Sequence, residues 1–426
     1  MQHASPEVRS ALTPLERLQT GSLCLLLAVL PLAHARAAQS IMIACSLLLF
    51  LPAFCRPQTH FSDSLPGVLW WVLAMWPGVA LLSALWSADP GRSLLGAIQS
   101  AVAPTGIFLA ALAAGRNPRM LRRVLVGGSA GIALLCLTTI GGLLKGGIPL
   151  VSQGANAVLA SDLIARWYPG PGLASTFALI GLPLSWWIWR ERLLPWGGAL
   201  VLAALLIGLL SFNRMYWLGL VVLIVIWMVS YRSGRYAPTK GRSGLLLICL
   251  CALVTLALLS TTVVRQSGSL SGQSIVQASH ALAKDPRWSI WSQWLDSGMQ
   301  RPLLGTGYGK EVARQVHADH FAPITAEMMD QAGKSHPHNL LLSLWIQTGL
   351  PGLLAFLCLM ASLASLAAAH ARRDTPARHA ALALGMTIAM LFFKNLTDDF
   401  YDIALPAMFW AYAGLMAGAM RGKTPT

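Results

Sequence analysis

The chain has 426 residues, of which 55% are hydrophobic and only 11% are charged, and its mean hydropathy is +0.60. A soluble domain normally carries about 25% charged residues, so this composition excludes a water-soluble globular protein and favours lipid as the solvent. The net charge of +15 does not indicate a nucleic-acid partner, because Lys and Arg gather in short loops between apolar segments.

Apolar segments of spanning length follow one another along most of the chain. A transmembrane helix needs about 20 mostly apolar residues, because the hydrocarbon core is about 30 Å thick and a helix rises about 1.5 Å per residue. We expect about twelve spans, at 18–34, 37–54, 67–86, 94–114, 121–143, 171–189, 194–212, 215–231, 244–263, 339–368, 378–396 and 403–420. The first should stay in place, since no signal-peptide cleavage site is evident.

Lys and Arg set the expected orientation, because they are retained on the cytoplasmic side of a membrane. With both termini inside, the short inner loops hold clusters of these residues, at 116–123, 190–192, 232–242 and 372–378. The short outer loops hold only single ones, namely Arg36, Arg92, Lys145 and Arg166. The sequence therefore predicts an all-α integral membrane protein that forms one polytopic domain over residues 1–426.

The segment 264–338, between the ninth and tenth spans, falls on the outer face and is far longer than a connection requires, as functional loops often are. Asp285 and Pro286 are typical of a helix start. The apolar residues that follow at helical spacing are Trp288, Trp291, Trp294, Leu295 and Met299. We expect a short amphipathic helix at the membrane surface, then a flexible turn at 305–309 and a second helical stretch near 321–332.

Several kinds of chemistry lack the residues that they need. No Asp or Glu lies inside an expected span, whereas ion-coupled transporters usually need ionisable groups near mid-membrane. The chain has no phosphate-binding loop for a nucleotide either. The seven cysteines lie in or beside apolar spans, so no disulfide framework is indicated.

Cations and histidines gather instead at the outer ends of spans, together with a few acids. The set comprises Arg214, Arg265, Arg287, His336, His338, Asn339, Lys394, Asp398, Asp399 and Asp402. Guanidinium groups bind phosphate oxygens in bidentate fashion, and a helix that begins at His338-Asn339 would add backbone N–H groups. A pyrophosphate on a lipid carrier fits such a site.

Each of these residues also has a structural interpretation. Arg214 could extend to the interface as a membrane anchor, the acids could pair with nearby cations, and tryptophans are common at interfaces. His317 and His320 could join the later histidines in a zinc site, but no cysteine or Glu-bearing zinc motif supports a metal. His338 is the strongest candidate, because a histidine can deprotonate a sugar hydroxyl, although by itself it could only cap a helix.

Three motifs resemble those of the O-antigen ligase and polymerase superfamily. They are Asn213-Arg214 with the residues up to 219, Arg287 with Trp291 followed by 302–309, and 336–341 followed by 349–352. Their order, and the long loop before the His-Asn motif, are similar to the family arrangement over about 171 to 410. Family members often carry Glu where Gln347 stands and Ser where Asn213 stands.

The resemblance implies a GT-C-like enzyme of the bacterial inner membrane, with a periplasmic active face and cytoplasmic termini. Members of the ligase branch transfer a polysaccharide from undecaprenyl diphosphate to lipid A–core, with inversion and without a metal or other cofactor. The expected partners are therefore this lipid-linked polysaccharide, the lipid A–core acceptor and membrane lipids. No nucleic acid is expected.

The resemblance also implies residue roles. His338 would be the catalytic base or would orient the acceptor hydroxyl, while Arg214 and Arg287 would hold the leaving pyrophosphate. The weaker substrate-binding candidates are Arg265, His336, Asn339 and Lys394, and the supporting ones are Asp398, Asp399 and Trp291.

Three alternatives remain open at this point. An O-antigen polymerase, or a ligase that transfers glycan to protein, would use the same donor, and the absence of a large C-terminal soluble extension favours the lipid acceptor. A lipid-linked sugar transporter would need polar groups through mid-membrane. A structural scaffold would leave the outer Arg and His cluster unexplained.

Overall fold

The computed structural model describes residues 12–55, 65–146, 164–211, 213–232, 287–318, 336–373, 375–397, 399, 401 and 403–421. Within these residues every regular element is helical. Six helices of the described part are long and apolar enough to cross a membrane, and three shorter apolar helices accompany them. The predicted all-helical membrane protein is thus confirmed in outline, while the count of twelve spans stays a prediction and the expected span 244–263 lies outside the described residues.

The observed helices follow the expected spans closely. They are α1 (Pro14–Val29), α2 (Arg36–Cys55), α3 (Gly67–Leu82), η2 (Ser83–Trp86), α4 (Pro90–Ala97), η3 (Ile98–Val102), α5 (Ala103–Arg116), α6 (Pro118–Gly146), α8 (Pro171–Arg190), α9 (Gly197–Leu210), α10 (Arg214–Arg232), α13 (Arg287–Met299), α14 (Lys310–Val316), α16 (Leu340–Ala371), α17 (Arg378–Asn395) and α18 (Ala404–Ala419). The fourth span is composite, because α4, the π-helical turn η3 and α5 form one run from Pro90 to Arg116.

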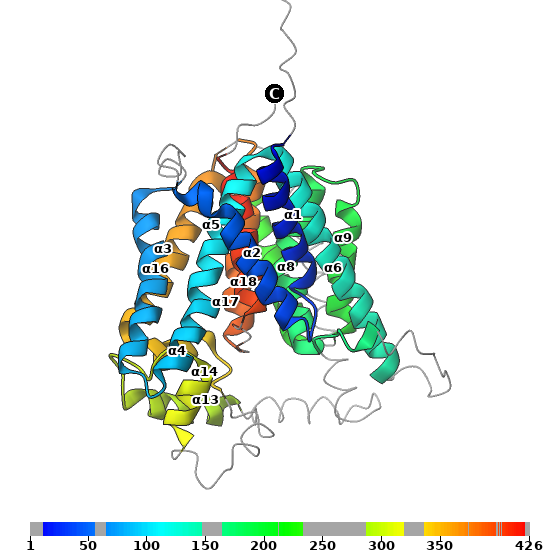
Figure 1. The fold of residues 1–426 in the computed structure, drawn as a ribbon. Helices are drawn as coiled ribbons and strands as arrows, with labels where there is room; N and C mark the ends of the chain where they lie inside the picture. Colours follow the sequence, from blue (N-terminus) through cyan, green and yellow to red (C-terminus); the bar gives the residue numbers. More distant parts are fainter. Residues whose placement is uncertain are drawn as a thin grey trace, which may run out of the picture.

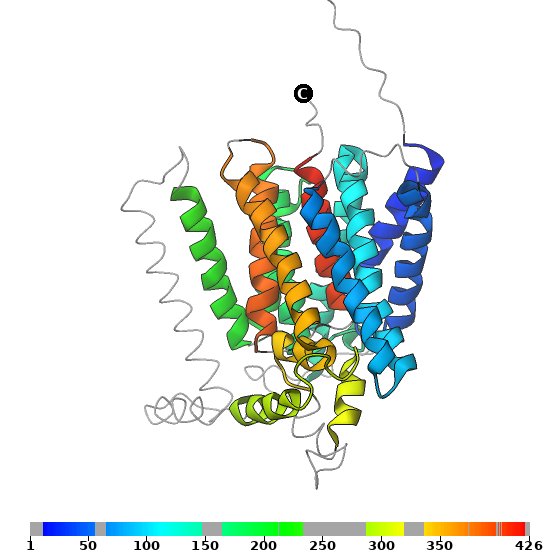
Figure 2. The ribbon, with the colours of Figure 1, turned by 90° about the vertical axis from the view of Figure 1, so that its left-hand side faces the viewer.

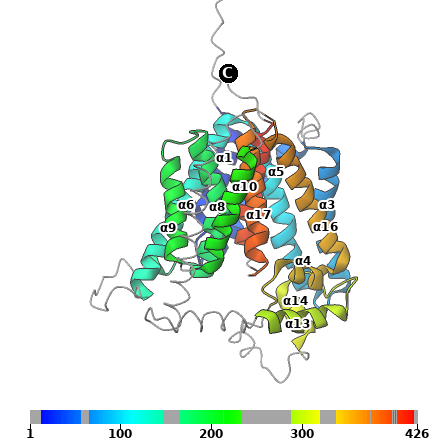
Figure 3. The same ribbon diagram turned by 180° about the vertical axis from the view of Figure 1, so that it is seen from behind.

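The long helices form a bundle with two distinct ends (Figures 1 and 2). The α5–α6, α8–α9 and α16–α17 connections lie at the upper end of Figure 1, and α4, α13 and α14 lie at the lower end. Helix α13 runs across the direction of the bundle helices (Figure 2). Seen from behind, α10 stands at the outside of the bundle, where it packs against α17 and α8 (Figure 3).

Helix α18 forms the centre of the bundle, because every residue from Leu405 to Gly418 is buried. A helix that is apolar on all sides belongs in such a position. Its glycines allow α5 to approach closely: a Cβ at Gly414 would lie 2.3 Å from the Phe108 carbonyl oxygen, and one at Gly418 would lie 2.3 Å from that of Leu112. Small residues at a helix contact permit this kind of packing in membranes.

Helix α16 covers the span expected over 339–368, but it is broken at Gly349, where φ is +66° and ψ is −171°. Pro351 has no N–H for the Gln347 carbonyl, and the Gly307 N–H donates to that carbonyl at 2.9 Å instead. The Thr306 N–H likewise donates to the Ile346 carbonyl at 2.9 Å. The loop therefore supplies donors to the two helix carbonyls that lose their partners at the break.

The glycine-rich segment 301–309, which contains the turn expected at 305–309, is tied to neighbouring elements by hydrogen bonds. Trp86 Nε1 donates to the Leu304 carbonyl at 2.7 Å, and the Tyr308 N–H donates to Ser83 Oγ at 3.0 Å. Leu350 N–H donates to the Pro302 carbonyl at 3.1 Å. The loop thereby ties η2 to the break in α16, with an ordered backbone on both sides.

The replacement Gly349→Ala is expected to lower the free energy of unfolding by about 2–5 kcal/mol, because L residues are strained at this φ and the added Cβ overlaps the loop. That Cβ would lie 2.0 Å from the Leu303 carbonyl oxygen. Thermal unfolding of the purified proteins in detergent measures the change. The matched control is Gly385→Ala in α17, where the nearest atom is 3.9 Å away. If both variants unfold alike, Gly349 has no special role.

Helix α13 confirms the predicted helix in the Trp-rich segment, although Asp285 and Pro286 lie outside the described residues. The expected apolar stripe divides between two sides of this helix. Trp294 is buried against Ala313 and Ile346, whereas Trp288, Leu295 and Met299 are 65%, 50% and 63% exposed. The exposed side suits a membrane surface, and contact with lipid there stays a prediction. The second helical stretch expected near 321–332 lies outside the described residues.

Candidate functional site

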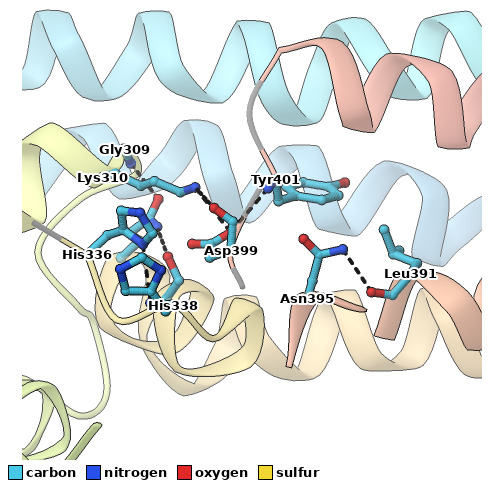
Figure 4. A network of polar contacts seen from close by, with 10 residues as sticks. Gly309, Lys310, His336, His338, Leu391, Asn395, Asp399 and Tyr401 are labelled. Atoms are coloured by element: carbon cyan, nitrogen blue, oxygen red, sulfur yellow. Dashed lines mark hydrogen bonds and ion pairs between the residues drawn. The ribbon is translucent and has the colours of Figure 1, made fainter. Parts of the chain in front are cut away.

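Three segments that are far apart in the sequence meet at the lower end of the bundle. They are the start of α14, the segment 336–339 that leads into α16, and the connection between α17 and α18 (Figure 4). The side chains of His336 and His338 lie next to each other there, and Lys310 reaches across to Asp399. This cluster brings together several of the residues that the sequence marked.

His338 has an unusual backbone, with φ at +50°. A residue other than glycine in this left-handed region costs about 1–3 kcal/mol and persists only where its surroundings hold it. The His338 N–H donates to Nδ1 of His336 at 3.2 Å, and the centroids of the two rings lie 3.9 Å apart. Both side chains are half-buried. The histidine pair is thus ordered and in contact, with part of each ring accessible.

Asn339 caps α16, since its Oδ1 accepts the Leu342 N–H at 3.1 Å. Its Nδ2 donates to the Leu396 carbonyl, also at 3.1 Å, which ties the start of α16 to the end of α17. Both ends of the Asn339 amide therefore hold the protein together. Its expected contact with substrate stays a prediction.

Lys310 and Asp399 form an ion pair, with Nζ 3.1 Å from Oδ1 and 2.7 Å from the Asp399 carbonyl oxygen. The Asp399 side chain is fully buried, and that of Lys310 is 26% exposed. Burial raises the pKa of the Asp399 carboxyl, but the charges of Lys310 and His336 and hydrogen bonds from Ser343 and Lys310 outweigh burial and hold this pKa below its ordinary value. Asp399 thus pairs with a cation, as the structural interpretation of the acids predicts.

Sequence reasoning missed Lys310. Its position is nevertheless informative, because it follows the glycine-rich segment directly and begins α14. The preceding residue, Gly309, donates its N–H to Gln347 Oε1 at 2.7 Å, and Gln347 Nε2 donates to Ser343 Oγ at 2.8 Å. These bonds fix the start of α14 against α16. A small hollow lies beside them, lined by Trp294, Lys310, His336, Pro337, Ser343 and Gln347 among others.

The other expected site residues are spread around this end or lie outside the described part. Arg214 is the first residue of α10 and is half-buried, next to Asn213, whose Oδ1 accepts the Met215 N–H at 2.9 Å. Lys394 is fully buried in the last turn of α17. Arg287 is the first residue of α13, and the ring of Trp291 lies 5.2 Å from that of Trp288. The residues outside the described part are Arg265, Asp398 and Asp402.

Of the two histidines, His317 and His320, that the sequence suggested for a zinc site, only the first lies within the described residues. His317 is buried at the end of α14, with its ring edge-to-face against Trp294 at 6.1 Å between centroids. His320 lies outside the described residues. In the described part of the chain, no group of three or more His, Cys, Asp or Glu residues is arranged to hold a metal ion.

One comparison with known proteins finds a match in the part of the chain that contains most of this cluster. A comparison with curated proteins found no match. Residues 199–357 match the model of the O-antigen ligase family. This segment runs from α9 into α16 and includes Arg214, α13, Lys310 and the histidine pair, whereas Asp399 lies beyond it. The match confirms the resemblance seen in the motifs: over residues 199–357 the chain is similar to the O-antigen ligase family.

Proposed function

We propose that this protein is a glycosyltransferase that transfers O-antigen polysaccharide from undecaprenyl diphosphate to lipid A–core in lipopolysaccharide biosynthesis. The observation that carries the proposal is the ordered histidine pair at the start of α16, which lies inside the segment that matches the O-antigen ligase family. Members of this superfamily act in lipid-linked glycan transfer. Such a reaction needs a base for the acceptor hydroxyl and cations for the diphosphate.

The lower end of the bundle faces the periplasm in this proposal, and the chain crosses the inner membrane about twelve times with both termini in the cytoplasm. The upper-end connections hold the Arg clusters that the positive-inside rule assigns to the cytoplasm, namely 116–123, 190–192 and 372–378. Helix α10 ends at the upper end and α13 lies at the lower end, and a ninth span within 244–263 is the connection that we propose between them. The loop 264–338 would then be periplasmic.

The proposed reaction is a single displacement at C1 of the first donor sugar. His338 takes the proton of the acceptor hydroxyl, and the acceptor oxygen forms a bond to C1 of the first donor sugar. The bond from C1 to the diphosphate oxygen breaks at the same time, and its electron pair leaves with the diphosphate, which Arg214 and Arg287 bind. Attack from the face opposite the leaving group inverts the configuration at C1. The diphosphate already activates the donor, so the step needs no cofactor.

The decisive experiment supplies the purified protein with lipid-linked glycan and either lipid A–core or further donor. Extension of lipid A–core, detected on a lipopolysaccharide gel, is the expected result. Growth of the donor glycan alone would identify a polymerase, and modification of an added acceptor protein would identify a protein O-glycan ligase. Movement of the donor across vesicles without transfer would identify a transporter, and each of these three results would reject the proposed activity.

Transfer is expected to keep its rate in the presence of EDTA, because cationic side chains take the place of a metal at the diphosphate. Initial rates with and without the chelator should agree within about twofold, a difference of less than about 0.5 kcal/mol in the barrier. The control restores zinc or magnesium after chelation. Loss of transfer with EDTA and recovery with either metal would show that the proposed mechanism lacks a component.

A further inference from the structure

The segment His336-Pro337-His338 forms a turn that is closed by a side chain. Nδ1 of His336 accepts the N–H of the residue two positions later, His338, at 3.2 Å. Asn and Asp close turns in the same way, with their side-chain oxygen in place of Nδ1. Pro337 sits in the middle of this turn, where its fixed φ favours the turn and its missing N–H costs nothing. His338 then adopts its left-handed φ of +50°, and Asn339 begins α16.

We infer that His336 is a positioning residue: as a neutral imidazole it holds the His338 backbone through this hydrogen bond and so directs the His338 ring toward the acceptor hydroxyl. The inference rests on the proposed function and deepens it. It assigns His336 a different role from the substrate contact that the sequence suggested. His336 acts through His338 and not on the diphosphate.

The hydrogen bond defines the protonation state that His336 needs. An Nδ1 that accepts an N–H carries no proton of its own, so the ring proton is on Nε2 and the ring is neutral. A protonated imidazole is a donor at both nitrogens and cannot make this bond. Acid therefore releases the turn, and it does so independently of any proton that His338 itself takes up.

Two groups of opposite charge face His336 and act on its protonation in opposite directions: the Asp399 carboxylate attracts a protonated imidazole, and the Lys310 ammonium repels it. The pair of Lys310 from α14 and Asp399 from the α17–α18 connection faces it, and the two charges lie 3.1 Å apart, so they largely cancel. The remaining neighbours from α13 and α16 that line the same hollow, such as Trp294, Ser343 and Gln347, carry no charge. The ring of His338 lies 3.9 Å away. A neutral His336 leaves His338 free to accept the acceptor's proton without repulsion from a second cation.

Three substitutions separate positioning from substrate binding. His336→Asn places an acceptor oxygen where Nδ1 stands, and His336→Gln moves the oxygen one bond further out, near the place of Nε2. His336→Ala removes both. We expect Ala and Gln to lower kcat by about 10–100-fold with little change in KM, because a misplaced base costs about that much. Asn should recover most of this loss. A substrate contact would instead raise KM, and Asn would then be no better than Gln.

The pH profile of kcat gives a second readout. In the wild-type protein transfer requires two neutral rings, His336 for the turn and His338 for the proton transfer, so acid acts on both. In His336→Asn only one group remains, so the acid side should become less steep. An equally steep profile in both proteins would overturn the inference, since His336 would not be a titrating part of the turn.

A measurement without activity separates this inference from the proposed function. The chain has ten histidines, and ¹⁵N-histidine NMR of the protein in lipid nanodiscs, compared with His336→Asn, identifies the His336 signals. We expect Nδ1 without a proton and Nε2 with one at neutral pH. A protonated Nδ1 would overturn the inference even if glycan transfer is found. Absence of transfer by the wild-type protein would reject the proposed function, and the ring signal would still decide the state of His336.

Discussion

Replacement of His338 is expected to reduce the rate of glycan transfer by about 10²–10⁴-fold, which is the usual contribution of a positioned general base. His338→Asn is the preferred variant, because asparagine tolerates the left-handed φ of +50° and the chain should stay folded. His338→Ala should lose transfer to the same extent with some loss of stability. Complementation of a ligase-deficient strain and initial rates on purified protein both measure the effect.

A matched control comes from the turn between α1 and α2. His34 is exposed and has φ at +56°, so His34→Ala changes the same residue type in the same backbone conformation away from the histidine pair. This variant should retain transfer. Full activity of a folded His338→Asn or His338→Ala protein would remove the proposed base, whereas equal loss in His34→Ala would indicate that backbone strain and not chemistry explains the effect.

The helices could be predicted from the sequence because lipid imposes a simple rule on them. Hydrocarbon provides no hydrogen bonds, so each crossing must be a helix of fixed minimum length with an apolar surface. Helix α8 spans Pro171–Arg190 against an expected 171–189, and α17 spans Arg378–Asn395 against 378–396. The break in α16 did not follow from this rule. It depends on contacts with the 301–309 loop, about 40 residues earlier, although Gly349 and Pro351 marked the place.

The site could be predicted only where its residues are neighbours in the sequence. Asn339 has the residue type of a helix cap and is one, and His338 precedes it as expected. The pairing of Lys310 with Asp399 joins residues 89 positions apart, so no local pattern indicates it. The burial of the Asp399 carboxylate, which the sequence does not show, also decides its role. Full burial makes Asp399 depend on the few groups that face it, Lys310, His336 and Ser343, whereas the sequence could suggest only that some cation lies near.

Lys310→Met is expected to lower the free energy of unfolding by about 3–5 kcal/mol, since removal of one partner leaves a buried charge without compensation. Asp399 is the fully buried partner, whereas Lys310 is 26% exposed and can regain water. Asp399→Asn should therefore cost less than Lys310→Met, and the double variant should recover most of the loss. Arg92→Met is the control, because the Arg92–Asp89 pair has side chains 64% and 31% exposed. An exposed pair of this kind contributes only about 0–1 kcal/mol.

The dependence of stability on pH should change its sign in Lys310→Met. In the wild-type protein the pKa of Asp399 lies below its ordinary value of 3.8, so its contribution is present above that pH and is lost as the pH falls through the lower, folded-state pKa. Without Lys310, the largest opposing charge is gone and burial raises this pKa. The variant should then gain stability as the pH falls from neutral toward 4, because the buried carboxyl takes up a proton. Thermal unfolding in detergent between about pH 2 and 7 measures both slopes, because that of the wild-type protein lies below pH 3.8 and that of the variant above it. Parallel slopes in the two proteins would mean that Lys310 does not hold Asp399 in its charged form.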